Sequence, residues 1–303
     1  MSMKNNVVRS PLFYVGDKYK IISEIKRYFP NDINRFVEPF VGGGSVFMNV
    51  EADEFLLNDI DSNIIAIHQM LCNSAENPND FYNRVDEVVE RYSLSRSYKE
   101  DVVPEELKRE FEKTYYARFN KVGYEKMRSD YNQSQDRRPF VLYMLLIYGF
   151  NRMIRFNKSG DFNLPVGNVD LNQNTINALN DYFKLSMIKR PQWFNYDFEE
   201  FINQIELEHN DLVYLDPPYL ITFSEYNKYW NEETEMRLLN ILNRLNDNGI
   251  RFAISNVTHY KGKVNQVFLD WSQQYNSHSI KSNYISYHDN TKKTFKEVLI
   301  TNY

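Results

Sequence analysis

The sequence predicts an α/β protein in which a mostly parallel sheet is interrupted by an inserted, mostly helical domain. Three observations predict this class. Strand, glycine-loop and helix patterns alternate in the first fifth of the chain, the alternation stops from about residue 78 to residue 190, and it returns from residue 193 onward. With 303 residues, 42 % of them hydrophobic and 25 % charged, the chain has the composition of a globular protein and not of a disordered one.

The first fifth of the chain has the pattern of a βαβ unit. Residues 35–40 form a short apolar run that ends at glycines, which predicts a buried strand. Residues 45–50 then predict a helix that Ser45 can cap. Residues 54–58 predict a second strand, and residues 61–71 predict a helix. The inner face of that helix carries Ile64, Ile65, Ile67 and His68.

Long polar and aromatic helical stretches replace the alternation in the middle of the chain. An apolar segment, residues 140–150, leads there into a loop punctuated by glycine and asparagine, residues 151–168. We therefore predict two domains, one made of residues 1–75 and 191–303 and the other inserted as residues 76–190.

The alternation returns in the last third and predicts the rest of the sheet. The predicted strands and helices are residues 193–196, 198–205, 211–215, 232–246 and 250–255. The tail, residues 279–303, alternates like two antiparallel strands joined by a turn at Asp289 and Asn290.

Charge is unevenly distributed along the chain. The whole chain has a net charge of −5, but residues 108–158 hold twelve Lys and Arg against five acids, a net charge of +7, which leaves −12 for the rest. A basic segment on an acidic protein is typical of a nucleic-acid contact surface. The alternative is a solvated helical face.

Several classes of protein are excluded by what the sequence lacks. It has no apolar run of the roughly 18 residues that span a membrane, and no signal segment opens the chain. Cys72 is the one cysteine, so neither a disulfide framework nor a thiolate metal cage is possible, and the five histidines do not have metal-ligand spacing. We expect a cytoplasmic protein without a membrane partner or a metal.

The first candidate site is the glycine loop Phe40-Val-Gly-Gly-Gly-Ser45, at the junction of a strand and a helix. Consecutive glycines let the backbone approach a ligand, and ligands of α/β sheets bind at the carboxyl ends of strands. The loop matches neither the Walker A pattern nor G-x-G-x-x-G. Asp59 ends the next strand and is placed to accept hydrogen bonds from ribose hydroxyls. These features favour S-adenosylmethionine, and a purely structural tight turn is the alternative.

The second candidate site, Asp216-Pro-Pro-Tyr219, directly follows a predicted buried strand. Two prolines fix φ near about −65° and remove two N–H groups, so that their carbonyls are held as acceptors. A carboxylate, fixed carbonyls and an aromatic ring form a site for an exocyclic amine with two N–H bonds and a flat ring. The alternative is an Asp-Pro turn.

These two motifs together resemble the Dam-type DNA adenine-N6 methyltransferases, the α group of the D12 class. Four further blocks carry the resemblance: residues 10–18, where Asp17 replaces the family's second glycine, residues 58–61, residues 155–157 with 160–167, which resemble the DNA-reading hairpin, and residues 291–299. The resemblance implies a Rossmann-like, S-adenosylmethionine-dependent methyltransferase sheet with an inserted DNA-recognition domain. Residues 1–75 and 191–303 would be catalytic, and residues 76–190 would recognise the target.

The residues themselves suggest how such a reaction proceeds. Asp216 and the carbonyl of Pro217 can accept the two hydrogens of the adenine amine, so that its lone pair points at the methyl group, while Tyr219 stacks on the base. The target must be flipped out of the duplex. Because Cys72 lies outside every block, a cytosine-C5 mechanism is excluded.

The resemblance also assigns candidate site residues. The catalytic set is Asp216, Pro217, Pro218 and Tyr219. The cofactor set is Tyr14, Lys18, Glu38, Pro39, Phe40, Gly42, Gly44, Ser45, Asp59, Ile60, Asp197, Phe198 and Asp216. The DNA set is Arg118, Asn151, Arg155, Asn157, Lys158 and Pro165.

The expected partners are double-stranded DNA, with a GATC-like site as the leading guess, and a cognate restriction endonuclease encoded nearby. Three alternatives stay open: an RNA adenine methyltransferase, a protein glutamine methyltransferase and an inactive DNA-binding module of the same fold.

Overall fold

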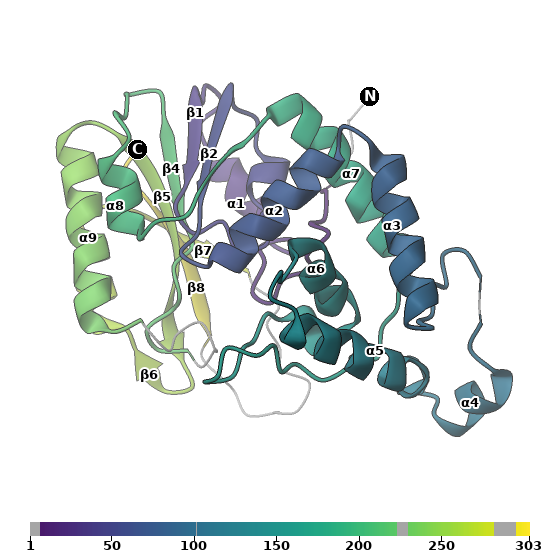
Figure 1. Ribbon diagram of the computed structural model, residues 1–303. Helices are drawn as coiled ribbons and strands as arrows, with labels where there is room; N and C mark the ends of the chain where they lie inside the picture. Colours follow the sequence, from purple (N-terminus) through teal and green to yellow (C-terminus); the bar gives the residue numbers. More distant parts are fainter. Residues whose placement is uncertain (1–6, 101, 223–229, 282–294) are drawn as a thin grey trace, which may run out of the picture.

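A single eight-stranded sheet lies at the centre of the computed structural model, which describes residues 7–100, 102–222, 230–281 and 295–303. The strand order is β3-β2-β1-β4-β5-β8-β7, with β6 paired to β5 (Figure 1). The five strands from β3 to β5 are parallel, whereas β8 runs antiparallel to β5 and β7. The predicted α/β class is therefore confirmed.

The strands have the following bounds: β1 Arg35–Glu38, β2 Glu54–Asn58, β3 Gln192–Phe194, β4 Leu212–Leu215, β5 Arg251–Tyr260, β6 Lys263–Val264, β7 Asn276–Ile280 and β8 Lys296–Thr301. The α-helices are α1 Ile22–Ile25, α2 Ser62–Ser74, α3 Pro78–Arg91, α4 Glu105–Glu110, α5 Tyr115–Gln133, α6 Pro139–Tyr148, α7 Gln173–Lys189, α8 Phe198–Asn203, α9 Glu232–Asp247 and α10 Gln266–Ser272. The described residues also form the short 3-10 helices η1 Lys26–Tyr28, η2 Phe47–Asn49 and η3 Phe150–Arg152.

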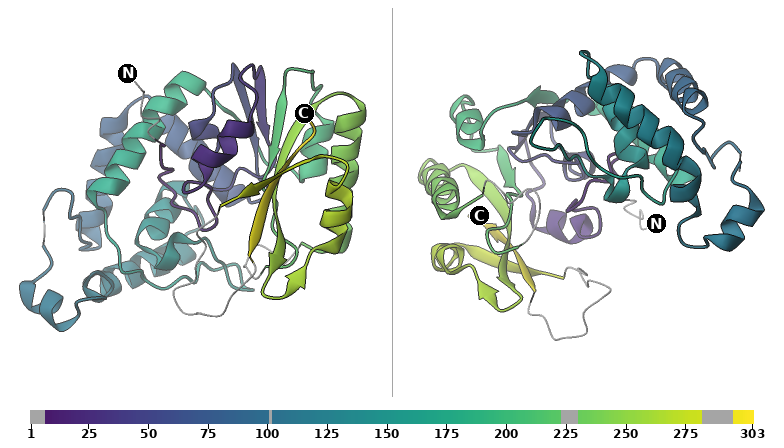
Figure 2. Two further views of the ribbon diagram at one scale, coloured as in Figure 1. Left: turned by 180° about the vertical axis from the view of Figure 1, so that it is seen from behind. Right: turned by 60° about the horizontal axis from the view of Figure 1, so that its bottom comes forward.

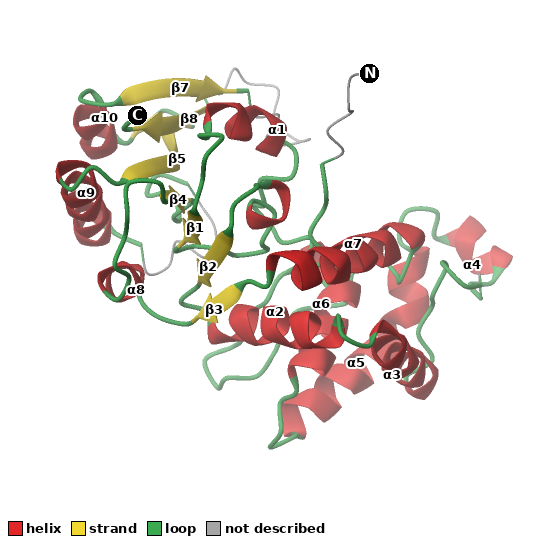
Figure 3. Cartoon of the chain, turned by 90° about the horizontal axis from the view of Figure 1, so that it is seen from above, coloured by secondary structure: helices red, strands yellow, loops and turns green. Residues whose placement is uncertain are grey.

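Both faces of the sheet are buried. Successive side chains of each strand point to opposite faces, so each central strand contributes to two apolar cores. On β1, Phe36 belongs to the core on the side of α2 and Val37 to the core on the side of α9. On β4, Tyr214 and Leu215 divide in the same way. Figure 3 shows α8, α9 and α10 along one face and α1, α2 and α7 along the other.

The chain reverses its direction of travel across the sheet between β1 and β4. From β1 it runs outward to β2 and β3, and it then returns to β4 and continues outward to β5 on the other side. Such a reversal leaves the carboxyl ends of the two central strands open to a ligand. The glycine loop follows β1, and Asp216 follows β4, so both candidate motifs lie at this point.

The inserted segment is helical, and it shares its core with one face of the sheet. Its apolar helix α6 is buried almost all round and packs against α2 and α5, while α7 also packs against α2. One continuous apolar core therefore includes Phe36 of the sheet and Tyr143 of the insertion. Figure 2 shows the insertion helices and the α9 side at opposite ends of the molecule. The boundaries at residues 76 and 190 stay a prediction.

The predicted helix over residues 45–50 is wrong. Only η2 forms there, and Ser45 makes no capping hydrogen bond. The side chain of Asn49 donates to the Ser45 carbonyl, while the Asn49 backbone N–H bonds Val46 in the 3-10 pattern. The same side chain is bonded to both backbone groups of Val8, which fixes this geometry.

Other elements were predicted with different bounds or missed. The first strand ends at Glu38 because Pro39 cannot continue the ladder, and β5 runs five residues beyond the predicted end. The short elements β6 and α10 were not predicted. Two antiparallel strands, β7 and β8, do form near the end of the chain, but β7 begins at Asn276 and shares only residues 279–280 with the predicted tail. The predicted turn at residues 289–290 lies outside the described residues. Among the described helices, none combines the length and the apolar character that a bilayer crossing needs.

Candidate active site

The candidate active site lies where the glycine loop after β1, the Asp216 loop after β4 and the N-terminal segment meet. Lys18, from the N-terminal segment, brings its ammonium within 2.6 Å of Oδ2 of Asp216 and donates to Oη of Tyr219 at 2.8 Å. Lys18 is almost fully buried, with 3 % of its side chain exposed, whereas Asp216 is 19 % exposed. The carboxylate of Asp216 therefore lies at the accessible rim of a buried charge network.

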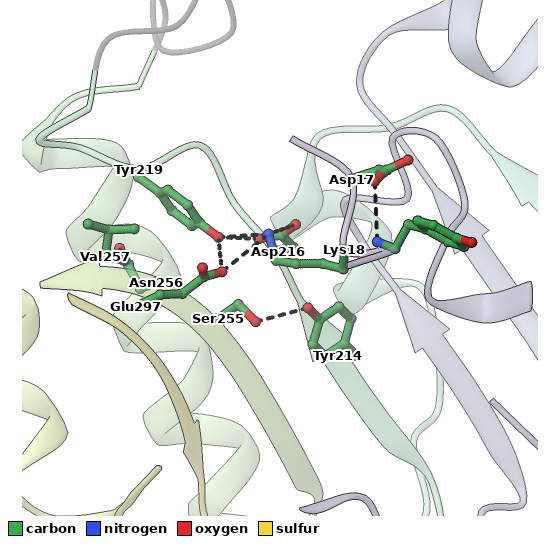
Figure 4. Close-up of polar contacts among 10 residues, drawn as sticks. Asp17, Lys18, Tyr214, Asp216, Tyr219, Ser255, Asn256, Val257 and Glu297 are labelled. Atoms are coloured by element: carbon green, nitrogen blue, oxygen red, sulfur yellow. Dashed lines mark hydrogen bonds and ion pairs between the residues drawn. The ribbon is translucent and has the colours of Figure 1, made fainter. Parts of the chain in front are cut away.

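Tyr219 connects this network to strand β8. Its hydroxyl donates to Oδ1 of Asp216 at 2.8 Å and lies 3.4 Å from Oε1 of Glu297 on β8. Figure 4 shows the three side chains pointing toward one another, with Lys18 beside them. Burial, followed by the negative charges of Asp216 and Glu297, raises the pKa of Tyr219 well above its usual value. The phenol is therefore neutral and can act as a hydrogen-bond donor.

The glycine loop is packed directly against the N-terminal segment. A side-chain carbon on Gly43 would lie only 2.7 Å from Cβ of Tyr14. Gly44 has φ of +77°, and a carbon on it would lie 2.5 Å from the ring of Phe47. The hydroxyl of Ser10 donates to the Gly43 carbonyl. The two segments thus require glycine here in order to fit together.

The half-buried Asp59 and the fully buried His68 both hydrogen-bond to the backbone of Gly42. Its N–H donates to Oδ2 of Asp59 at 2.9 Å, and its carbonyl accepts a hydrogen bond of 2.8 Å from Nε2 of His68. Because Nε2 must then carry the proton, Nδ1 accepts from the hydroxyl of Tyr182 at 2.8 Å. Burial raises the pKa of Asp59 to about 6 and lowers the pKa of His68 to about 4. His68 is therefore neutral at pH 7.

The site residues predicted beyond the loop lie at the neighbouring strand ends. Asp197 caps α8 and forms an ion pair with Arg237, at 2.7 Å between Oδ1 and Nη2. Phe198 is buried beside Phe40, with ring centroids 5.4 Å apart, and both rings contact Trp230. The carbonyl of Pro39 accepts from the Asn58 side chain, and Ile60 is 71 % exposed next to Asp59.

The residues around the glycine loop fit S-adenosylmethionine. Glu38 is buried, and among the described residues its Oε2 has no hydrogen-bond partner. Burial and the charge of Asp216 raise the pKa of Glu38 well above its usual value. The charges of both Asp216 and Asp59 act on Glu38, so three carboxyl groups lie near one another at this strand edge. Such groups suit a ligand with ammonium, sulfonium and ribose hydroxyl groups.

The predicted DNA-reading residues lie on a loop that is tied to α5. Two antiparallel bridges, Gly149 with Val166 and Phe156 with Phe162, give this loop its hairpin form. Arg155 lies across the hairpin, with Nε 2.8 Å from Oδ1 of Asn163. Arg128 of α5 donates to the Leu164 carbonyl at 2.9 Å. The hairpin is therefore held in shape by side chains from both sides.

The remaining residues of the predicted DNA set lie at or near its tip and base. Lys158 is exposed at the tip, where Oδ1 of Asn157 accepts from two backbone N–H groups. Asn151 is exposed with φ of +53°, and the carbonyl of Pro165 accepts from Phe150. Arg118 is exposed on α5, with its guanidinium 4.6 Å from the centre of the Phe111 ring.

Comparison with known proteins shows the family to which the chain belongs. The family model of the D12 class N6 adenine-specific DNA methyltransferases matches residues 14–286. The chain belongs to this class.

Relatives of this D12 chain include two modification enzymes. It is 34 % identical to the type II methyltransferase M.FokI of Planomicrobium okeanokoites over 99 % of its length and 43 % of that protein. It is 34 % identical to the modification methylase StsI of Streptococcus sanguinis over its full length and 44 % of that protein. It is also 28 % identical to the DNA adenine methylase of Escherichia coli K12 over 98 % of its length and 95 % of that enzyme. The chain thus spans less than half the length of the first two relatives.

These findings confirm the predicted family, the methyltransferase fold and the S-adenosylmethionine cofactor of the class. The structure brings Lys18, Asp216 and Tyr219 of the predicted set together, and it places Asp59 and Gly42 in direct contact. The roles of all the site residues stay predictions.

Three features of the D12 chain were missed in the sequence. Glu297 was included in the last family block without a role, His68 was assigned only to a helix face, and Trp230 was not considered. Each contacts residues of the site from a distant part of the chain. The one sequence signal among them is that Glu297 lies in a strand otherwise rich in apolar residues.

Proposed function

We propose that this protein transfers the methyl group of S-adenosylmethionine to N6 of an adenine in a short duplex DNA sequence. The position of Asp216 is the observation that carries the proposal. Its carboxylate follows β4 at the reversal point of the sheet, beside the glycine loop, and it is the most exposed member of an otherwise buried charge network. A hydrogen-bond acceptor at this position is accessible to a base that has left the duplex.

The side chains of the site have separate roles in this proposal. Asp216 and the Pro217 carbonyl accept the two amine hydrogens, which directs the nitrogen lone pair away from the ring. Tyr219 stacks on the base, and Lys18 offsets the negative charge of Asp216 from 2.6 Å away. S-adenosylmethionine supplies the methyl group. The chain contributes position and preorganised acceptors, the two effects that are most productive in such a transfer.

The basic segment, residues 108–158, supplies the DNA surface in this proposal. Exposed cations on α5 and the hairpin suit phosphate contacts, and Lys158 at the tip is one of them. Arg155 is the proposed base-reading side chain, with the hairpin held behind it by Asn163 and Arg128. A GATC-like site remains the leading guess. The names of the M.FokI and StsI relatives favour a partner restriction endonuclease. A DNA substrate also fits the predicted cytoplasmic location.

The test is methylation of plasmid DNA in a host that lacks adenine methylation, followed by sequencing that reads modified bases. We expect N6-methyladenine at one short sequence, and none with Asp216→Ala. Asp247→Ala, an exposed carboxylate at the end of α9, is the matched control. A loss of less than about tenfold for Asp216→Ala, or ~1.4 kcal/mol of transition-state stabilisation, contradicts the role of Asp216.

The alternatives predict different outcomes of the same assay. An RNA adenine or protein glutamine methyltransferase leaves the plasmid unmodified but labels RNA or protein with a radioactive methyl group. An inactive DNA-binding module labels nothing and shows no S-adenosylmethionine binding by calorimetry.

A further inference from the structure

We propose that Glu297 is a positioning residue for methyl transfer, because it accepts the Tyr219 hydroxyl when Asp216 receives the target amine. This inference rests on the proposed role of Asp216 as the amine acceptor. Glu297 lies on β8, is buried, and has its Oε1 3.4 Å from Oη of Tyr219 and 3.8 Å from Nζ of Lys18. Nothing in the transfer reaction itself requires a carboxylate at this position.

The hydrogen bonds of Tyr219 show why a second acceptor is needed. Lys18 donates to the phenol oxygen at 2.8 Å, so the single phenol proton is left for an acceptor other than Lys18. In the structure it goes to Oδ1 of Asp216 at 2.8 Å. With Lys18 on Oδ2 as well, both oxygens of Asp216 already have a donor.

The arriving amine changes this arrangement. Its N–H groups compete with the Tyr219 hydroxyl for the carboxylate of Asp216. The base itself stacks on the face of the Tyr219 ring, so it does not replace the hydroxyl's hydrogen bond. A hydroxyl that loses its acceptor in a partly buried site is costly. Among the described residues, Glu297 is a second carboxylate beside the phenol, with its Oε1 3.4 Å from Oη of Tyr219 (Figure 4).

The location of Glu297 suits a fixed acceptor. β8 pairs with β5 on one side and β7 on the other, so its backbone is held by two ladders. The alternative is that Glu297 serves only to neutralise the buried charge of Lys18. That alternative requires no contact with Tyr219, and the two explanations therefore differ in whether the tyrosine hydroxyl matters.

The experiment is a double-mutant cycle with Glu297→Gln and Tyr219→Phe, measured as single-turnover methyl transfer by the full chain on cognate DNA. Gln retains the shape and an acceptor oxygen, but a neutral acceptor makes a weaker hydrogen bond than a carboxylate. We expect Glu297→Gln to lower the transfer rate about tenfold, with the affinity for S-adenosylmethionine unchanged. In the Tyr219→Phe background, which keeps the stacking ring, the same change should lower the rate less than about twofold.

Equal fold-losses in both backgrounds, or no loss in either, overturn the proposal. Glu297→Asp is the second variant: it keeps a charge near Lys18 but withdraws the oxygen from Tyr219, so we expect the same loss as with Gln. A wild-type rate for Glu297→Asp means that neutralising Lys18 is the whole role. Thermal melting of each variant shows whether it is folded, and Asp216→Ala is run in parallel, because activity of that variant contradicts the proposed function and not the role of Glu297 alone.

Discussion

Replacing His68 with phenylalanine should change how the stability of the protein depends on pH. His68 is fully buried, and its Nε2–H holds the Gly42 carbonyl while Nδ1 accepts from Tyr182. Phenylalanine keeps a ring that can stack on Trp193, which lies 4.5 Å from His68 between ring centroids, but it makes neither hydrogen bond. At pH 7.5 we expect Phe to cost about 2–4 kcal/mol, because two buried polar groups lose a partner.

The pH dependence follows from the pKa of His68, which burial lowers to about 4 in the folded protein from its ordinary value of 6.5. Between these two values the unfolded chain binds the proton and the folded chain does not, so this contribution to stability is present above pH 6.5 and is lost as the pH falls toward 4. The full loss is about 3 kcal/mol, of which about 2 kcal/mol is lost by pH 5.

Urea unfolding at a series of pH values between 7.5 and 5 measures the effect for the wild type and His68→Phe. Other groups titrate in this range, and the difference between the two proteins isolates His68. The stability gap should shrink by about 2 kcal/mol from pH 7.5 to pH 5. A gap that stays constant within about 0.5 kcal/mol refutes the assignment of a neutral, hydrogen-bonded His68.

Three further predictions concern the cofactor loop and the DNA surface. Asp59→Asn should weaken S-adenosylmethionine binding about tenfold by titration calorimetry. We expect the affinity of the wild type to fall below pH 6, where Asp59, with its pKa of about 6, becomes protonated, and the affinity of Asp59→Asn not to change there; an unchanged affinity for Asp59→Asn would show that Asp59 only supports the backbone. Gly43→Ala should destabilise the protein by about 1–3 kcal/mol in urea, because its side chain meets Tyr14 at 2.7 Å, and full stability would mean that the two segments separate easily. Arg155→Ala should relax discrimination at one base pair by about 1–3 kcal/mol in competition binding, whereas Lys158→Ala should weaken all sequences alike, and a uniform loss for Arg155→Ala would make it a backbone contact.

The parts of the fold that could be predicted are those with a periodic or local signal. The apolar run of β4 and the prolines after it mark a buried strand that ends at Asp216, and the glycines after β1 mark the partner loop. The meeting of these two loops follows from the rule that parallel strands present their carboxyl ends at one edge. The family resemblance then added Lys18 and Tyr14, which no periodicity indicates.

The parts that could not be predicted depend on single polar contacts between distant residues. Residues 47–49 form the 3-10 helix η2 and not an α-helix, because the Asn49 side chain bonds to Val8 and to the Ser45 carbonyl. Helix propensity contains no information on such contacts. The link from Glu297 to Tyr219 spans 78 residues of chain. Arg155 and Asn163 were both visible in the hairpin block, but their direct bond depends on the fold of the loop.

The position of β8 has a consequence for how the protein is made. This strand lies between β5 and β7, although it follows both in the chain, and it carries Glu297 into the site that Lys18 enters from the N-terminal side. During synthesis β5 and β7 therefore emerge without the strand that joins them, and their open edges wait for residues 296–301. A nascent chain that has already folded its glycine loop and its insertion helices still lacks one wall of the reaction site. The proposed methyl transfer should therefore begin only after residues 296–301 have left the ribosome and paired with β5 and β7.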